Sequence, residues 1–118
     1  MTERKKVLII DDEQGIRDML SMVLLMNNFE SLCACDGETA ALLAERTCFD
    51  VIISDYSMPG MNGAEVIRKV RALCPRSFII GISAGANRTA FLEAGADTFL
   101  RKPFSPDDLL ALLLPLSL

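Results

Sequence analysis

The amino-acid sequence predicts one α/β domain, spanning residues 1–118, built around a doubly wound parallel sheet with helices on both faces. Two observations carry this prediction. Short apolar, β-branched runs alternate five times with segments of helical periodicity, which is the pattern of a (βα)5 unit. The chain has 118 residues, 51% of them hydrophobic, so it is long enough for one domain and too apolar to be disordered.

Five segments are expected to be strands. Most are short apolar runs bounded by polar or turn-forming residues, whereas the second is half-polar and is expected at an edge of the sheet. In chain order, the expected strands are 7–10, 29–35, 51–55, 78–83 and 98–100. Right-handed crossovers and the length of the chain favour the flavodoxin-like strand order 2-1-3-4-5.

Five helices are expected after these strands. The first has apolar residues at helical spacing from Ile16 to Leu24 and ends at Asn27, and the fourth ends at Gly95. The last begins at Ser105, an N-cap hydroxyl that is followed by proline and two acidic residues. In chain order, the expected helices are 16–24, 39–44, 64–73, 88–94 and one that starts at 106.

The last helix carries more apolar surface than one core contact requires. Its expected core stripe consists of Leu109, Leu112, Leu113 and Leu116. Leu110 and Leu114 lie four residues apart on another face. We expect that second face to pack in a homodimer or against an effector domain.

The composition excludes several classes of function. The chain has no histidine, so Ser-His-Asp and Cys-His catalysis and histidine-ligated zinc are impossible. Its net charge of −4 argues against direct binding of nucleic acid, and no apolar stretch has the length of a membrane span. The acidity is concentrated in residues 1–60, which hold 11 acidic and 5 basic residues and are therefore suited to a cation site.

The chain shows no secretory signal and is therefore expected to be cytoplasmic, where cysteines stay reduced. The Cys-x-Cys pair has no second pair or histidine at zinc spacing, so the thiols are expected to be buried and not to bind metal. The four cysteines are Cys33, Cys35, Cys48 and Cys74.

Chemically distinctive residues fall where the predicted strands end. Asp11 and Asp12 follow the first strand, and Asp55 ends the third. Ser83 ends the fourth strand, and Lys102 follows the fifth. Because ligands bind at the carboxyl ends of parallel strands, near the switch point between strands 1 and 3, we expect these side chains to form one site.

These residue types suit phosphoryl transfer that is assisted by a hard cation. Three carboxylates at one point repel one another unless a cation holds them, and few oxygen ligands with open water positions favour Mg²⁺, with Mn²⁺ as an alternative. The metal, Lys102 and the Ser83 hydroxyl can each stabilise one phosphoryl oxygen. Asp55 is the central carboxylate and the candidate nucleophile, which would form an acyl phosphate.

The motifs LIIDDE, VIISDYSMPGMNG, ISA, AGAD and KPF, taken together, resemble the receiver domain of two-component response regulators of the chemotaxis-regulator type. The resemblance spans roughly residues 5–115. It implies that Asp55 accepts a phosphoryl group from the phosphohistidine of a sensor histidine kinase or a histidine phosphotransfer domain. It also implies that Asp11, Asp12 and Asp55 hold Mg²⁺ together with the backbone carbonyl of Ser57.

The resemblance implies a switch around the same site. Ser83 would be the hydroxyl that moves toward the phosphoryl group, and Phe99 the aromatic residue that turns inward with it. Lys102 would pair with Asp55 or its phosphate, and the Lys102–Pro103 peptide bond would be cis. Ala84 carries only a methyl group and leaves room for the phosphoryl group. The interval from Ser83 to Lys102 is shorter than is usual in the family by about one helical turn, which is about 3.6 residues.

Two alternatives remain beside this hypothesis. An aspartyl-phosphate phosphatase of the haloacid-dehalogenase type uses similar residues, but its nucleophile follows the first strand in an Asp-x-Asp pattern, and Asp11 and Asp12 are adjacent. The other is a pseudo-receiver, an interaction module that is not phosphorylated. The expected protein is therefore a signalling regulator that modifies only itself, and not an enzyme acting on a free metabolite.

Overall fold

The computed structural model describes residues 4–58 and 60–117. In chain order, its strands are β1 (Lys5–Ile10), β2 (Phe29–Ala34), β3 (Val51–Asp55), β4 (Phe78–Ser83) and β5 (Thr98–Arg101). Its helices are α1 (Gln14–Met26), α2 (Gly37–Arg46), α3 (Gly63–Leu73), α4 (Arg88–Ala94) and α5 (Pro106–Leu113), followed by the 3₁₀ helix η1 (Leu114–Ser117). None of the described helices is long and apolar enough to cross a membrane.

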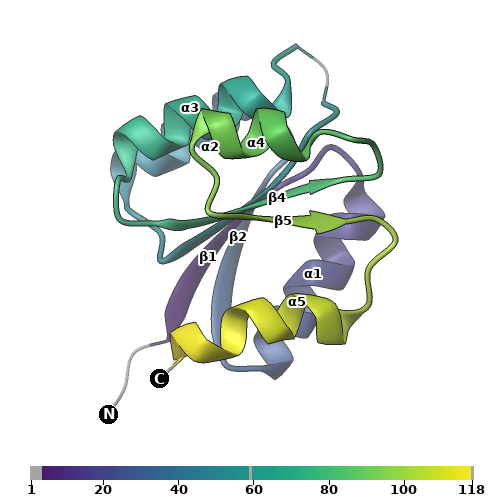
Figure 1. The fold of residues 1–118 in the computed structure, drawn as a ribbon. Coiled ribbons are helices and arrows are strands. Elements are labelled where there is room, and N and C mark those ends of the chain that lie inside the picture. Colours follow the sequence, from purple (N-terminus) through teal and green to yellow (C-terminus); the bar gives the residue numbers. More distant parts are fainter. Residues whose placement is uncertain (1–3, 59, 118) are drawn as a thin grey trace.

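The strands form one parallel sheet in the order β2-β1-β3-β4-β5, with helices on both faces (Figure 1). Helices α2, α3 and α4 cover one face, and α1 and α5 cover the other. This arrangement confirms the predicted fold class and the predicted strand order.

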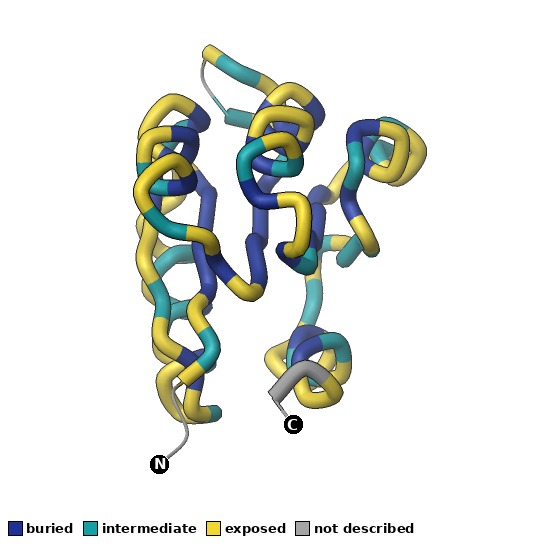
Figure 2. The backbone as a smooth tube through the Cα atoms, turned by 90° about the vertical axis from the view of Figure 1, so that its left-hand side faces the viewer, coloured by how far each residue is buried: buried dark blue, intermediate teal, exposed yellow. Residues whose placement is uncertain are grey.

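Alternate strand residues divide the core into two parts. Leu8 and Ile52 pack with α2, α3 and α4, whereas Val7 and Ile53 pack with Leu24 of α1 and with α5. Figure 2 shows a deeply buried centre, formed by the strands β1, β3 and β4, between helices whose outer sides are exposed. Because side chains alternate along a strand, a parallel sheet buried on both faces requires the continuous apolar runs that the sequence has.

Several elements are longer than the sequence pattern predicts, among them α2 and β1. Helix α2 begins at Gly37, because Asp36 is an N-cap whose carboxylate accepts a hydrogen bond from the backbone N–H of Thr39 at 2.7 Å. From the sequence alone, the pair Asp36-Gly37 is typical of a turn, and the helix is therefore expected to begin only at residue 39. Strand β1 begins at Lys5, because Lys5 and Lys6 continue the pairing with β2 although their side chains are polar.

The predicted second apolar face of the last helix is present only in part. Leu110 is half-buried and Leu114 is 51% exposed. Helix α5 ends at Leu113, and the side chain of Leu116, expected in the core stripe, lies outside the described residues. Among the residues whose side chains are described, the most exposed large apolar ones are Met22, Leu25 and Met26 of α1, and the sequence pattern did not predict their exposure.

The prediction that all four cysteines are buried is wrong. Only Cys74 is buried, whereas the other three are exposed, and all four are free thiols. Cys33 lies on β2, which is the strand at one edge of the sheet, and Cys48 lies in the loop between α2 and β3. The apolar character of a thiol does not by itself bury it at such positions.

Candidate functional site

The pairing of the strands brings the predicted site residues to one edge of the sheet. Asp55 ends β3 opposite Ile82, next to Ser83 at the end of β4. The backbone N–H of Lys102 donates to the carbonyl of Ser83 at 3.0 Å, which continues the β4–β5 pairing beyond the end of β5. The backbone N–H of Asp11 donates to the carbonyl of Ala34 at 3.1 Å and extends β1 in the same way.

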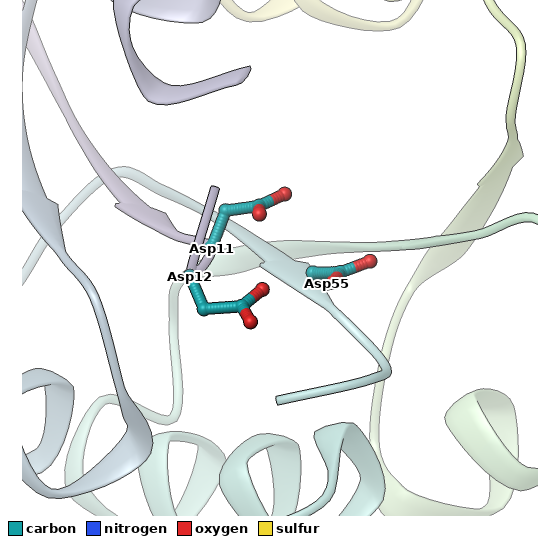
Figure 3. Close-up of side chains that lie close together, drawn as sticks. All are labelled: Asp11, Asp12 and Asp55. Atoms are coloured by element: carbon teal, nitrogen blue, oxygen red, sulfur yellow. The ribbon is translucent and has the colours of Figure 1, made fainter. Parts of the chain in front are cut away.

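Three aspartates form an acidic cluster at this edge. Asp11, Asp12 and Asp55 each place one carboxylate oxygen within 4.8 Å of the other two (Figure 3). Asp11 and Asp55 are buried, with exposed fractions of 1% and 6%, whereas Asp12 is exposed. The sequence therefore predicted this juxtaposition correctly, and the cluster has one side open to solvent.

Lys102 is the cation of the site. Its Nζ lies 3.2 Å from Oδ1 of Asp55 and 3.7 Å from Oδ2 of Asp11. The Lys102–Pro103 peptide bond is cis. A single ammonium group between two buried carboxylates leaves the site with an excess of negative charge, to which Asp12 adds.

One buried oxygen in the acidic cluster has no hydrogen-bond partner. Oδ1 of Asp11 accepts the backbone N–H of Glu13 at 2.9 Å, but Oδ2 of Asp11 accepts none. Its distance to Lys102 is too long for a hydrogen bond. A buried carboxylate oxygen that lacks a donor is costly, and a cation bound between the three carboxylates would supply the missing partner. The donor set of carboxylate oxygens fits a hard divalent cation.

Burial shapes the protonation of the site. Desolvation raises the pKa of Asp11, and the charge of Asp55 adds to this, although the N–H of Glu13 opposes it. Desolvation also raises the pKa of Asp55 against the lowering effect of Lys102. Burial alone would lower the pKa of Lys102, but the charges of Asp11 and Asp55 outweigh it, so the pKa of Lys102 lies above its usual value.

The raised pKa of Asp11 predicts a stability difference that depends on pH. An aspartate whose pKa is raised by folding destabilises the folded state when it is ionised. Below its ordinary pKa of 3.8, Asp11 is protonated in both the folded and the unfolded state and does not destabilise the fold. The destabilisation grows as the pH rises through the pKa that Asp11 has in the folded state. In metal-free buffer, Asp11→Asn should therefore melt at the same temperature as the parent at about pH 3.5 and above it at about pH 7. Thermal melts of the two proteins across this range measure the difference.

Asp18→Asn, an exposed carboxylate on α1, is the matched control and should show no such trend. A melting temperature of Asp11→Asn that falls below the parent's as the pH rises would contradict the prediction. Addition of Mg²⁺ at neutral pH should then raise the melting temperature of the parent more than that of Asp11→Asn, because a ligand stabilises the state that binds it.

Asn87 joins the site, although the sequence analysis did not identify it. Its Nδ2 donates to Oγ of Ser83 at 2.7 Å, and the backbone N–H of Gly85 donates to the same oxygen at 3.0 Å. Asn87 occupies the N-cap position of α4, where an asparagine side chain usually caps the helix, but it makes no capping hydrogen bond. Two donors occupy both lone pairs of the Ser83 hydroxyl, so its hydrogen is free to be donated elsewhere.

The remaining predicted residues surround this edge. Ser57 and Ala84 are exposed in the loops that follow β3 and β4. Phe99 is half-buried on β5 and packs against Phe91 of α4, with ring centroids 5.7 Å apart. An open cavity with a volume of about 470 Å³ lies between α4 and β5, and Phe99 lines it.

Comparison with known proteins identifies the class to which this fold and site belong. The sequence profile described as "Response regulator receiver domain" matches residues 7–114. The chain belongs to the receiver domain family of response regulators. Receiver domains are signalling regulators, and this assignment leaves the haloacid-dehalogenase alternative without support.

Individual relatives agree with this assignment. The transcriptional regulatory protein ResD of Bacillus subtilis is 37% identical over 107 residues, which are 89% of this chain and 45% of ResD. The chain thus spans about half the length of the curated relatives that it matches.

Two solved structures are similar to this chain over nearly their whole length. Chemotaxis protein CheY4 of Vibrio cholerae is 35% identical with a TM-score of 0.88, and the match covers 98% of this chain and 99% of that one. The receiver domain of sensor histidine kinase PA1611 from Pseudomonas aeruginosa PAO1 is 26% identical with a TM-score of 0.87, covering 95% of this chain and 96% of that one. That structure has a magnesium ion coordinated in the active site cleft.

Proposed function

We propose that this chain is a phosphoacceptor switch, in which Asp55 receives a phosphoryl group from the phosphohistidine of a sensor histidine kinase or a histidine phosphotransfer domain. The observation that carries this proposal is the contact between Lys102 and Asp55 at 3.2 Å, beside a buried carboxylate oxygen of Asp11 that lacks a partner. A structural role would favour neutral residues at this edge. A site for a metal ion and a phosphoryl group requires these charges.

Asp11, Asp12 and Asp55, with the backbone carbonyl of Ser57, are the proposed ligands of Mg²⁺, with Mn²⁺ as the alternative ion. When bound, the metal would neutralise negative charge on the phosphoryl oxygens. The receiver domain of PA1611, in which a magnesium ion is coordinated in the active site cleft, supports this choice of ion. Asp12 is the exposed member of the acidic cluster, so an ion can enter the cluster from solvent on the side where Asp12 lies.

The transfer needs little from the protein beyond position and charge. A carboxylate oxygen of Asp55 attacks the phosphorus, the bond from phosphorus to the donor nitrogen breaks, and an acyl phosphate forms on Asp55. Lys102 is already placed to neutralise one oxygen of the transferred group, and Ser83 has a hydrogen to donate to another. The product carries nearly two negative charges, which would draw Ser83 and Lys102 toward it and shift the loops that hold them.

Binding of beryllofluoride, which imitates a phosphoryl group on aspartate, tests the proposal. Tyr56 follows Asp55 directly and is the only tyrosine in a chain without tryptophan, and its ring packs against Phe91 with centroids 5.2 Å apart. Tyrosine fluorescence should therefore change saturably when beryllofluoride and Mg²⁺ are added together. Each component alone should produce no comparable change.

Asp55→Asn is the decisive control, because it leaves Tyr56 and the fold in place but removes the acceptor carboxylate. An equal response in Asp55→Asn, or no response in the parent, would contradict a phosphoacceptor function. The latter result would favour the pseudo-receiver instead.

Asn87→Ala is expected to weaken the binding of beryllofluoride. Loss of its hydrogen bond lets the Ser83 hydroxyl rotate, so that its hydrogen is no longer reserved for the phosphoryl group. A neutral hydrogen bond contributes about 1 kcal/mol, which corresponds to roughly a fivefold weaker affinity. Titration with beryllofluoride at saturating Mg²⁺ measures the change.

Thr89→Ala, an exposed position in the first turn of α4, is the matched control and should leave the affinity unchanged. An unchanged affinity in Asn87→Ala would show that Ser83 is held by other groups. The Mg²⁺ affinity without beryllofluoride should be the same in all three proteins, because Asn87 does not contact the acidic cluster.

The wider context remains a proposal. We propose a cytoplasmic protein in which residues 1–118 form one receiver domain that does not itself bind nucleic acid. ResD, a transcriptional regulator about twice as long as the matched segment, supports the proposal that an effector domain can accompany such a domain. The homodimer or effector contact through the last helix stays a prediction.

A further inference from the structure

Two thiols meet at the edge of the sheet opposite to the acidic cluster. Cys48 lies in the loop that leads into β3, and Cys74 is the C-cap of α3, shortly before β4 begins. Their Sγ atoms are 3.2 Å apart. We propose that Cys48 and Cys74 form a redox modification site, which closes to a disulfide by exchange with a small disulfide of the glutathione class.

The two sulfur atoms need only a short movement to form a disulfide bond. A disulfide has an S–S distance of about 2.05 Å, so the two sulfur atoms must approach by roughly 1 Å. Cys74 is fixed, because it ends a helix and its Sγ also contacts the carbonyl oxygen of Ala44 at 3.6 Å. Cys48 belongs to no helix or strand, so its loop can supply the movement.

The two thiols differ in access, which sets the order of their reactions. Cys48 is exposed, whereas Cys74 has an exposed fraction of 1%. Burial raises the pKa of the Cys74 thiol, and its contact with Cys48 adds to this. A reagent in solution therefore meets Cys48 first, and Cys74 reacts only with what Cys48 carries.

A cavity beside the two sulfur atoms gives the reagent a place to bind. It has a volume of 480 Å³, and both cysteines line it. This volume lies in the range of sites for small molecules. Lys5 and Arg76 also line the cavity and offer positive charge to the carboxylates of a glutathione-class disulfide. Asp50 is the one acidic residue that lines the cavity, and its carboxylate accepts a hydrogen bond from the backbone N–H of Lys6 at 2.8 Å.

The chemistry balances in two exchange steps. Cys48 loses its proton to solvent, and its thiolate attacks the small disulfide, which forms a mixed disulfide and releases one small thiolate. Cys74 then loses its proton and attacks the Cys48 sulfur, which forms the Cys48–Cys74 bond and releases the second small thiolate. The two released thiolates take up the two protons, so the protein is oxidised by two electrons and the small disulfide is reduced to two thiols.

The other two cysteines provide an internal comparison. Cys33 and Cys35 are also exposed, but Sγ of Cys33 contacts the hydroxyl of Ser21 at 3.4 Å and Sγ of Cys35 contacts the carboxylate of Asp36 at 3.6 Å. Neither contacts another sulfur among the described residues. At Cys33 and Cys35 we therefore expect mixed disulfides with the small thiol. A disulfide within the chain requires two thiols in contact, as Cys48 and Cys74 are.

The test is to incubate the reduced chain with glutathione disulfide, to block the remaining thiols by alkylation and to map the peptides by mass spectrometry. We expect a peptide pair linked through Cys48 and Cys74 before any other linked pair forms, with a loss of about 2 Da that dithiothreitol reverses. In Cys74→Ser, the reaction should stop at the mixed disulfide between glutathione and Cys48. In Cys48→Ser, Cys74 should stay unmodified.

The double variant Cys33→Ser/Cys35→Ser should form the same linked pair, because it retains both thiols of the site. The proposal is overturned if the parent forms a Cys33–Cys35 bond first, or if Cys48 acquires glutathione but Cys74 never displaces it. It is equally overturned if Cys74 is modified in Cys48→Ser as fast as Cys48 is in the parent. The peptide map of the parent decides the question even where a serine at position 74 impairs folding.

Discussion

Replacement of Asp55 by asparagine is expected to reduce phosphorylation by a small acyl phosphate to background. Asp55 is the carboxylate nearest to Lys102 and belongs to the acidic cluster, so its loss removes both the proposed nucleophile and one proposed metal ligand. Removal of a nucleophile lowers a rate by at least about 10³-fold. Intact-protein mass spectrometry after incubation with acetyl phosphate and Mg²⁺ should show a gain of about 80 Da in the parent and none in Asp55→Asn.

The same variant should remain folded, which separates lost chemistry from lost structure. Because burial raises the pKa of Asp55 in spite of Lys102, the ionised carboxylate is a cost to the folded state at neutral pH. Asp55→Asn should then melt no lower than the parent in metal-free buffer. Asp18→Asn should be phosphorylated like the parent, and a gain of about 80 Da in Asp55→Asn would locate the acceptor elsewhere.

Phe91→Ala is expected to cause the largest loss of stability among single substitutions of α4. Phe91 is fully buried, and a Cβ atom on Gly81 would lie only 2.5 Å from its Cγ, so the ring rests directly on β4. Its neighbours include the rings of Tyr56 and Phe99. Truncation of a buried phenylalanine costs about 3–5 kcal/mol, which for this length lowers the melting temperature by roughly 12–20 °C.

Leu92→Ala is the matched control, since Leu92 is the next residue of the same helix and is 37% exposed. Its effect should stay below about 1 kcal/mol. Urea denaturation of the three proteins measures both values. Similar losses for Phe91→Ala and Leu92→Ala would mean that the contact with Gly81 does not hold α4 to the sheet.

The Phe91 ring also connects the loop after β3, which follows the proposed acceptor, to the predicted switch residue. Tyr56 follows Asp55, and Phe99 is the aromatic residue to which the family resemblance assigns a switching role; the Phe91 ring packs against both of them. We therefore expect Phe91→Ala, at a temperature where it is folded, to reduce the change in Tyr56 fluorescence on binding of beryllofluoride. Leu92→Ala should leave that change intact.

The sequence was most informative where chemistry depends on the ends of strands. Most of the strands could be located from apolar runs, and the topology of a parallel sheet then brings Asp11, Asp55 and Lys102 together without knowledge of any side-chain position. The start of α2 was missed, because Asp36 can form either a turn or a helix cap and only the backbone of Thr39 decides between them.

Features that depend on the direction of individual side chains could not be predicted. Cys48 and Cys74 are 26 residues apart, and their contact follows from the packing of α2 against α3. Asn87 could be identified as a helix N-cap, but its side chain turns to Ser83 instead, which no local pattern shows. Gly81 could be placed in a strand, whereas the reason for its lack of a side chain is the Phe91 ring.

The complete burial of β3 has a consequence for how a signal can leave the site. Every residue of β3 is buried, and it is hydrogen-bonded to strands on both sides. Its amides should therefore exchange with solvent only on global unfolding, among the slowest in the domain. A group attached to Asp55, as proposed, would therefore lie against a rigid strand, and we expect it to displace the exposed loops that carry Ser57 and Ala84 instead. A domain built in this way can acquire a different output surface through changes in its loops while its reaction centre stays the same.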